Sequence, residues 1–231
     1  MRRGKFLRKS KAVFPELIVI DDPTPRPGPL NMAIDEVLLS IARPATLRFY
    51  RWNTPSVSFG YFVRFAEARE IAGNRALVRR WTGGGIVPHG DDLTYSITIG
   101  APNDAFALSS KIIYQRVHST LGNALREIGI VAVLTETKAA KISDTCFANP
   151  VVSDVIESGR KIAGAAQRKT RGGLLHQGSI QRGNLDERFR NAFARLLGQR
   201  VVEEGIGTDV LHAAEELAIT KYATVDWLRR C

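Results

Sequence analysis

The fold class can be read from residues 151–180, VVSDVIESGRKIAGAAQRKTRGGLLHQGSI. Three strand-like runs, VVSDVIES, KIAGAAQ and LLHQGSI, follow one another there, and the turn signal Ser158-Gly159-Arg160 joins the first two as a hairpin. Strands joined by so short a turn pair antiparallel, whereas βαβ units pair parallel strands through a helix. The stretch therefore excludes a simple Rossmann layout and favours an α/β or α+β sheet with antiparallel parts.

Strands and helices are intermixed along the rest of the chain. The expected strands are residues 47–52, 56–62, 93–100 and 131–136. The expected helices are residues 30–41, with Asn31 as a cap, 65–72 and 109–129, and two more beyond Asp186. Because no internal repeat or linker interrupts the pattern, we expect one domain, residues 30–231, behind a basic arm and irregular lead-in, residues 1–29.

The composition is that of an ordinary soluble domain. The 231 residues are 44% hydrophobic, enough for a substantial core, and no apolar run approaches the length of about 18 residues that predicts a membrane span. The basic start lacks the apolar run of a secretory signal, so we expect a cytoplasmic protein. The two cysteines, Cys146 and Cys231, exclude a disulfide framework.

The net charge of +10 is unevenly distributed, because six positive charges lie within residues 1–11. Such a run is typical of a solvated arm. The body remains basic without the arm, which suits an acidic partner such as a carrier protein. Outside the arm, basic residues are not interleaved with aromatic residues in a stacking pattern, so no nucleic-acid partner is expected.

A first candidate site is RRWTGGGIVPHGDDLTYS, residues 79–96. Three successive glycines after a strand let backbone amides approach a ligand that a Cβ would obstruct, and the two arginines before them could hold a carboxylate or phosphate. The alternative is a glycine bulge beside two surface arginines. Neither the P-loop nor the GxGxxG pattern is met, so the motif is a candidate anion or acyl site and not a standard nucleotide cradle.

A second candidate site contains Cys146 and Lys161. Cys146 lies in the polar stretch SDTCFANP, and Lys161 opens a strand whose small residues, among them Gly164 and Ala165, leave room for a ligand. A nearby ammonium would stabilise the thiolate and lower the cysteine pKa. The alternative is that Cys146 is a buried small hydrophobe and Lys161 a solvated hairpin residue.

The histidines divide between the motifs and a helix. His89 and His176 lie in the two glycine-bearing motifs and are candidates to line a site, whereas His118 lies on the long helix and is expected to be structural or exposed. No HExxH, CxxC or clustered-carboxylate pattern accompanies them, so we expect no metal site.

Three motifs, taken in order, resemble those of the biotin/lipoate protein ligase superfamily, specifically its lipoate-ligase branch: NMAIDEVLL, RRWTGGGIVPHGDDLTYS and RKIAGAAQRKTRGGLLHQGSI. The resemblance runs from about Leu30 to about Leu197. It implies a mixed, largely antiparallel sheet flanked by helices, related to the catalytic domains of biotin ligases and class II synthetases. It also implies that the arginine/glycine motif lines an acyl tunnel and that the lysine of the KIAG strand reaches the acyl carbonyl.

The resemblance puts the arginine/glycine motif around the acyl chain and Lys161 at the reacting carbon. The expected catalytic residues are Cys146 and Lys161. The expected acyl- or substrate-binding residues, including the candidates named above, are Arg79, Arg80, Thr82, Gly83, Gly84, Gly85, His89, Gly164, Ala165, His176 and Gly178.

Two chemistries compete within this branch. Lipoate ligases use ATP and Mg to activate a free acid as an acyl-adenylate, whereas octanoyltransferases take the acyl group from acyl carrier protein through a cysteine thioester and need no cofactor. TCFANP and HGDDLTYS resemble the transferases. Gly85 is more usual in ligases, and Ala165 and Gln177 stand where serine and histidine are common, which bears on substrate preference.

The transferase chemistry is the one we expect, with acyl carrier protein as the donor. The acceptor implied by the resemblance is a lysine of a lipoyl domain or of a glycine-cleavage carrier. The alternatives are an ATP-dependent lipoate ligase that uses Lys161 alone and an amidotransferase that moves octanoyl groups between carrier proteins.

Overall fold

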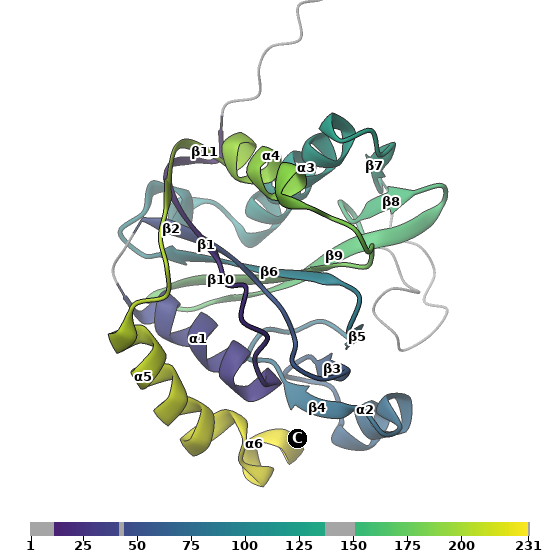
Figure 1. The fold of residues 1–231 in the computed structure, drawn as a ribbon, viewed down its shortest axis with the longest axis vertical. Coiled ribbons are helices and arrows are strands. Elements are labelled where there is room, and N and C mark those ends of the chain that lie inside the picture. Colours follow the sequence, from purple (N-terminus) through teal and green to yellow (C-terminus); the bar gives the residue numbers. More distant parts are fainter. Residues whose placement is uncertain (1–11, 42–43, 137–150, 231) are drawn as a thin grey trace, which may run out of the picture.

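The structure, a computed structural model, describes residues 12–41, 44–136 and 151–230. Its centre is an eight-stranded mixed sheet (Figure 1). In spatial order the strands are β11 (Gly198–Glu203), β1 (Phe14–Asp21), β2 (Ala45–Tyr50), β6 (Leu93–Gly100), β10 (Gly173–Ile180), β9 (Arg160–Lys169), β8 (Val155–Glu157) and β7 (Ala132–Leu134). β1 is parallel to β11 and β2, and every pair from β2 to β7 is antiparallel. The predicted mixed, largely antiparallel sheet and its hairpin β8–β9 are confirmed.

Helices cover both faces of this sheet. α3 (Ser110–Glu127) and α4 (Glu187–Leu197) lie on the upper face in Figure 1, and α1 (Gly28–Ser40) and α5 (Thr208–Leu217) lie on the lower face. The Ser109 side chain caps α3 by accepting a hydrogen bond from the Ile112 amide. The apolar stripe of α3 joins α4 and the upper face of the sheet in one core, in which Val117, Leu121 and Phe193 are fully buried.

The alternation of β6 sends its side chains to different environments. Tyr95 and Ile97 point into the core under α3 and α4, whereas Thr94 and Ser96 belong to the opposite face, where Ser96 donates to Asp35 of α1 at 2.7 Å. Polar residues of the central strands are therefore gathered on the α1 side, which is also where the site lies.

A second, three-stranded sheet lies below the first. β3 (Ser56–Phe59) pairs parallel with β4 (Ala76–Arg79) and antiparallel with β5 (Ile86–His89), while α2 (Phe65–Ala72) and α6 (Val225–Arg229) pack beside it. The glycine loop, residues 80–85, joins β4 to β5. It passes so close to β3 that a Cβ on Gly60 would lie 2.0 Å from the Gly84 carbonyl oxygen.

Three expectations need correction. Residues 1–29 were expected to lie outside the domain, yet β1 is paired on both sides. Its residues 17–20, LIVI, are buried on both faces and so show no alternation. Asn31 is not a cap but lies in the first turn of α1, where its amide donates to the carbonyls of Arg26 and Arg51. The described residues beyond Asp186 form three α-helices and a π-helical turn, Ala218–Tyr222, because Thr224 caps a further short helix, α6.

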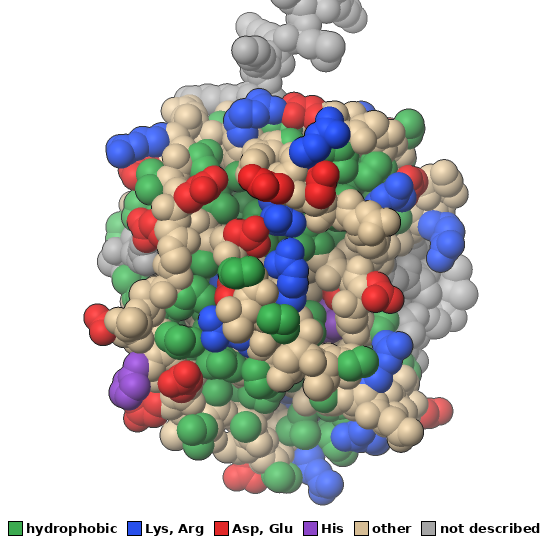
Figure 2. Space-filling model, viewed as in Figure 1, with side chains coloured by type: hydrophobic (Ala, Val, Ile, Leu, Met, Phe, Trp, Pro, Cys, Tyr) green, Lys and Arg blue, Asp and Glu red, His purple; other side chains and the backbone are tan. Residues whose placement is uncertain are grey.

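Charge on the described surface is mixed. On the face in Figure 2, acidic side chains and those of lysine and arginine lie interspersed, with hydrophobic side chains between them. None of the helices in the described ranges is long and apolar enough to cross a membrane.

Candidate functional site

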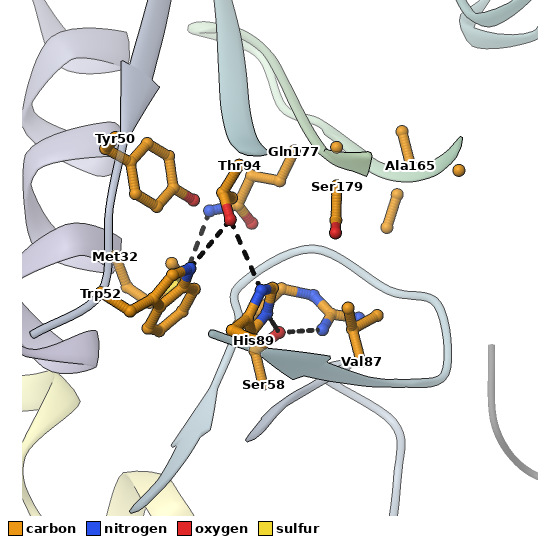
Figure 3. A pocket seen from close by; sticks show the side chains of 14 residues that line it. Met32, Tyr50, Trp52, Ser58, Val87, His89, Thr94, Ala165, Gln177 and Ser179 are labelled. Atoms are coloured by element: carbon orange, nitrogen blue, oxygen red, sulfur yellow. Dashed lines mark hydrogen bonds between the residues drawn. The ribbon is translucent and has the colours of Figure 1, made fainter. Parts of the chain in front are cut away.

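A narrow pocket opens between the two sheets (Figure 3). Strand β9 forms one wall with three small residues, Gly164, Ala165 and Ala166. The remaining apolar lining comes from α1, β2 and its extension, and β5, namely Met32, Tyr50, Trp52 and Val87. The pocket is therefore built for an apolar, slender ligand.

Five of the expected substrate-binding residues line this pocket: Arg80, His89, Gly164, Ala165 and Gly178. Gly178 has no side chain and contributes only its backbone to the lining. A Cβ at this position would lie 2.3 Å from the Tyr95 ring on the opposite face of the sheet. His89 forms the floor, with its ring stacked on Trp52 at a centroid distance of 4.0 Å.

The glycine loop is held against the pocket by its neighbours. Arg80 donates to the carbonyls of Gly83 at 3.1 Å and Gly85 at 2.8 Å. Gly84 has a φ of +81°, and a Cβ there would meet Ala166 at 3.1 Å, so this position requires glycine for both conformation and space. Thr82 donates to the Gln177 side chain at 2.8 Å and so ties the loop to β10. The loop shapes the wall, although Arg80 alone among its residues lines the pocket.

Arg79 and His176 do not line the pocket, contrary to expectation. The Arg79 side chain is fully buried and donates to the carbonyls of Tyr61, Val63 and Leu228, which holds the C-terminal helix against the small sheet. His176 alternates with Gln177 along β10 and so points to the α3 side, where it contacts Gln167 and Tyr95. Burial, together with neighbouring His118, lowers the pKa of His176 well below its usual value.

Lys161 is buried and lies beside the pocket wall. Its side chain is 2% exposed, and Nζ is 2.8 Å from Oδ2 of Asp154, which is fully buried. Asp154 also accepts hydrogen bonds from the Tyr114 hydroxyl and, at 2.7 Å, from the Val151 amide. The alternative of a solvated hairpin lysine is therefore wrong, since the ammonium is held in a desolvated hydrogen-bonded cluster.

Tyr114 and Asp154 were missed by the sequence reasoning. Tyr114 also accepts from the amide of Ala165 at 3.2 Å, so it connects Asp154 to the pocket wall. Burial first, and then the Asp154 charge, raises the pKa of Tyr114, which stays a neutral donor. No motif marks this pair; the only available signal was that a buried lysine requires a carboxylate partner.

His118 packs against this cluster through Tyr114 and Ser153. It is fully buried, and Nδ1 lies 2.7 Å from the Ser153 carbonyl, which can only accept, so Nδ1 carries the proton. Its ring centroid is 4.1 Å from that of Tyr114. Burial lowers the pKa of His118 to about 4, which keeps the ring neutral. His118 is thus structural, one of the two outcomes expected for it.

Gln177, at a position where histidine is common in the family that the sequence resembles, joins the loop to a buried polar cluster. It accepts from Thr82 and donates to Asp35 at 2.8 Å. Asp35 in turn is paired with Arg48 at 3.0 Å. An amide fits this position because it must accept on one side and donate on the other.

Cys146 lies outside the described residues. Among the described residues, no group of three or more His, Cys, Asp or Glu side chains is arranged to hold a metal ion.

Gly164 is expected to be required for the position of Lys161. A Cβ at residue 164 would lie 2.5 Å from Cε and 2.7 Å from Nζ of Lys161, so Gly164→Ala should displace the ammonium. A shift of this size is expected to lower kcat of the catalysed reaction by about 10²-fold, with the fold intact. Gly183→Ala is the matched control, because a Cβ there meets nothing within 4 Å. Full activity of Gly164→Ala, with circular dichroism unchanged, would contradict this role.

The family model for the lipoyl protein ligase A/B catalytic domain matches residues 27–205. The chain is 39% identical over 166 residues to octanoyltransferase LipM of Oceanobacillus iheyensis, a match that covers 68% of this chain and 61% of that protein. It is 29% identical over 255 residues to octanoyltransferase LipM of Moorella thermoacetica, covering 87% of this chain and 93% of that protein. The chain thus spans less than two thirds of the Oceanobacillus relative.

Solved structures share the fold. A lipoate-protein ligase A bound with ATP superposes with a TM-score of 0.70 at 24% identity, covering 93% of this chain and 98% of that one. A bi-partite lipoate protein ligase from Thermoplasma acidophilum superposes with a TM-score of 0.67 at 24% identity, covering 93% and 95%. Because the family model matches 179 of 231 residues (27 through 205), this chain belongs to the lipoyl protein ligase A/B catalytic domain family.

Proposed function

We propose that this protein is an octanoyltransferase, which moves an octanoyl group from acyl carrier protein to a lysine of a lipoyl-carrier domain. The observation that carries the proposal is the buried Lys161 ammonium, held by Asp154 beside a narrow apolar pocket. The curated relatives named octanoyltransferase LipM favour octanoyl transfer over ligation.

Cys146 is proposed as the nucleophile. It precedes Val151 by five residues, a stretch that spans at most about 18 Å when extended. The Val151 amide donates to Asp154, the partner of Lys161, and this connection along the sequence supports the proposal that Cys146 works with the Lys161 ammonium. A cationic neighbour lowers the pKa of a cysteine thiol and raises the fraction present as thiolate.

The reaction proceeds in two transfers. In the first, the Cys146 thiolate attacks the octanoyl thioester carbon, the bond from that carbon to the carrier sulfur breaks, and the carrier thiolate leaves with a proton from Lys161. In the second, the acceptor lysine attacks the acyl-enzyme, its excess proton passes to the neutral Lys161 amine, and the Cys146 thiolate leaves. Lys161 therefore ends in its starting state, and the products are a carrier thiol and an amide.

Carrier proteins are both the donor and the acceptor of the octanoyl group. The donor is acyl carrier protein, whose acidic surface suits the basic charge of this chain, and the acceptor is a lipoyl domain or glycine-cleavage carrier. Because a thioester is already activated, the transfer uses no ATP. Ligation of free lipoate with ATP is the rival activity, favoured by the fold shared with an ATP-bound ligase.

Intact-mass spectrometry after incubation with octanoyl acyl carrier protein, without ATP, tests the proposal. We expect a mass gain of one octanoyl group that disappears in Cys146→Ala and persists in Cys231→Ala, the matched control. No adduct on the wild-type protein, together with AMP release and lipoylation of a carrier when ATP and free lipoate are supplied, would replace the transferase with a ligase.

A further inference from the structure

A chain of buried hydrogen bonds runs under the pocket. The Asp92 side chain is fully buried and accepts at Oδ2 from His89 Nδ1 at 2.8 Å, from Thr94 at 2.8 Å and from Ser179 at 2.6 Å. The other ring nitrogen of His89, Nε2, lies 2.6 Å from the Ser58 hydroxyl. Figure 3 shows Ser58 and His89 facing each other at the pocket floor.

The direction of each of these hydrogen bonds follows from the protonation states of Asp92 and His89. Burial by itself raises the pKa of Asp92, but the His89 ring and the hydroxyl donors lower it further, so Asp92 is a carboxylate and can only accept. Burial lowers the pKa of His89, so the ring is neutral and carries one proton, which must be on Nδ1. His89 Nε2 is then an acceptor, and Ser58 donates its hydroxyl proton to it.

Ser58 is connected to the glycine loop through Arg80. Its oxygen accepts from Arg80 Nη1 at 2.6 Å, and Nη2 of the same guanidinium donates to the carbonyls of Gly83 and Gly85. These hydrogen bonds therefore link β6 and β10, through Asp92, to the glycine loop, of which Arg80 lines the pocket.

We propose that Asp92 is a positioning residue: by holding His89 as the Nδ1–H tautomer it orients Ser58 and Arg80, and with them the glycine loop around the acyl chain. The order Ser58, His89, Asp92 is that of a hydrolase triad. Here Ser58 is 1% exposed and its hydroxyl accepts a hydrogen bond from Arg80, so it acts as a link and not as a nucleophile. The effect on acyl binding rests on the proposed transferase function. The assignment of the His89 tautomer is independent of that function.

Nitrogen-15 NMR of the histidine rings tests the tautomer without any substrate. The chain has four histidines, and His89→Gln assigns the signal. We expect His89 to be protonated on Nδ1 in the wild type and in Ser58→Ala. Asp92→Ala should release this preference, and Asp92→Asn should retain it, because an amide oxygen can still accept from Nδ1. A proton on Nε2 in the wild type, or a preference unchanged in Asp92→Ala, would overturn the proposal.

Steady-state kinetics tests whether these hydrogen bonds contribute to binding of the octanoyl donor. Ser58→Ala is expected to raise KM for the octanoyl donor about tenfold, the equivalent of one lost hydrogen bond, with kcat within about threefold. Ser56→Ala is the matched control, because Ser56 lies two residues earlier on β3 and donates instead to the Thr54 carbonyl. Equal KM values for the two variants would refute the link to the pocket. A wild type without octanoyl transfer would refute the proposed function and leave the tautomer result standing.

Discussion

Replacing Lys161 with methionine is expected to lower kcat/KM for octanoyl transfer by about 10²–10⁴-fold, the range for loss of a positioned acid–base group. Methionine keeps the length and most of the volume of the buried stem but supplies neither charge nor proton. In the proposed mechanism, the Cys146 thiol then loses the cation that would stabilise its thiolate, and the leaving carrier thiolate loses its proton donor. A rate within tenfold of the wild type would contradict this role.

Stability must be separated from chemistry in this variant, because Lys161→Met leaves the Asp154 carboxylate buried without its cation. The double variant Lys161→Met/Asp154→Asn removes both charges and is expected to recover the free energy of unfolding without recovering activity. Arg160→Met, at the exposed neighbouring position, controls for the loss of a positive charge. Recovery of activity in the double variant would show that the single variant failed through misfolding.

Replacing Arg48 with methionine is expected to lower the free energy of unfolding by about 3–5 kcal/mol, a large share of the roughly 5–15 kcal/mol of an ordinary domain. The Arg48 side chain is fully buried and donates to Asp22 at 2.8 Å, to Asp35 at 3.0 Å and to the Asn31 side chain at 2.8 Å. Burial alone raises the pKa of Asp22, but hydrogen bonds from Arg26 and Arg48 lower it further, so Asp22 is ionised. Without Arg48, this carboxylate and that of Asp35 lose a shared buried cation.

Urea denaturation measures this effect. Arg51→Met is the matched control: Arg51 lies in the next segment of chain, is 38% exposed and pairs with Asp21 at 3.6 Å, so its loss should cost less than about 1 kcal/mol. Because Asp35 also holds Gln177, we expect Arg48→Met to loosen the glycine loop as well. Equal unfolding midpoints for the two variants would exclude Arg48 as the centre of the cluster.

Alternation along two strands held more information about the site than the motifs did. In LLHQGSI the period of two puts His176 on one face and Gln177 and Ser179 on the other, and in LTYSITIG it separates Tyr95 from Thr94. The glycine-bearing motif by itself nevertheless grouped His176 with the pocket residues. Treating the motif as a strand would have assigned His176 to the core and Ser179 to the pocket.

The amino-acid sequence by itself determined the helices α1, α2 and α3, the antiparallel hairpin at residues 158–160, the glycine loop and the family, because periodicity, turn chemistry and motif order depend on neighbours along the chain. Only the tertiary structure decided which side chains meet. Tyr114 meets Asp154 across 40 positions, and Asp92 meets Ser179 across 87. Such partners are chosen by strand order and helix packing, and a buried charge or hydroxyl shows its need for a partner only once the fold has removed it from water.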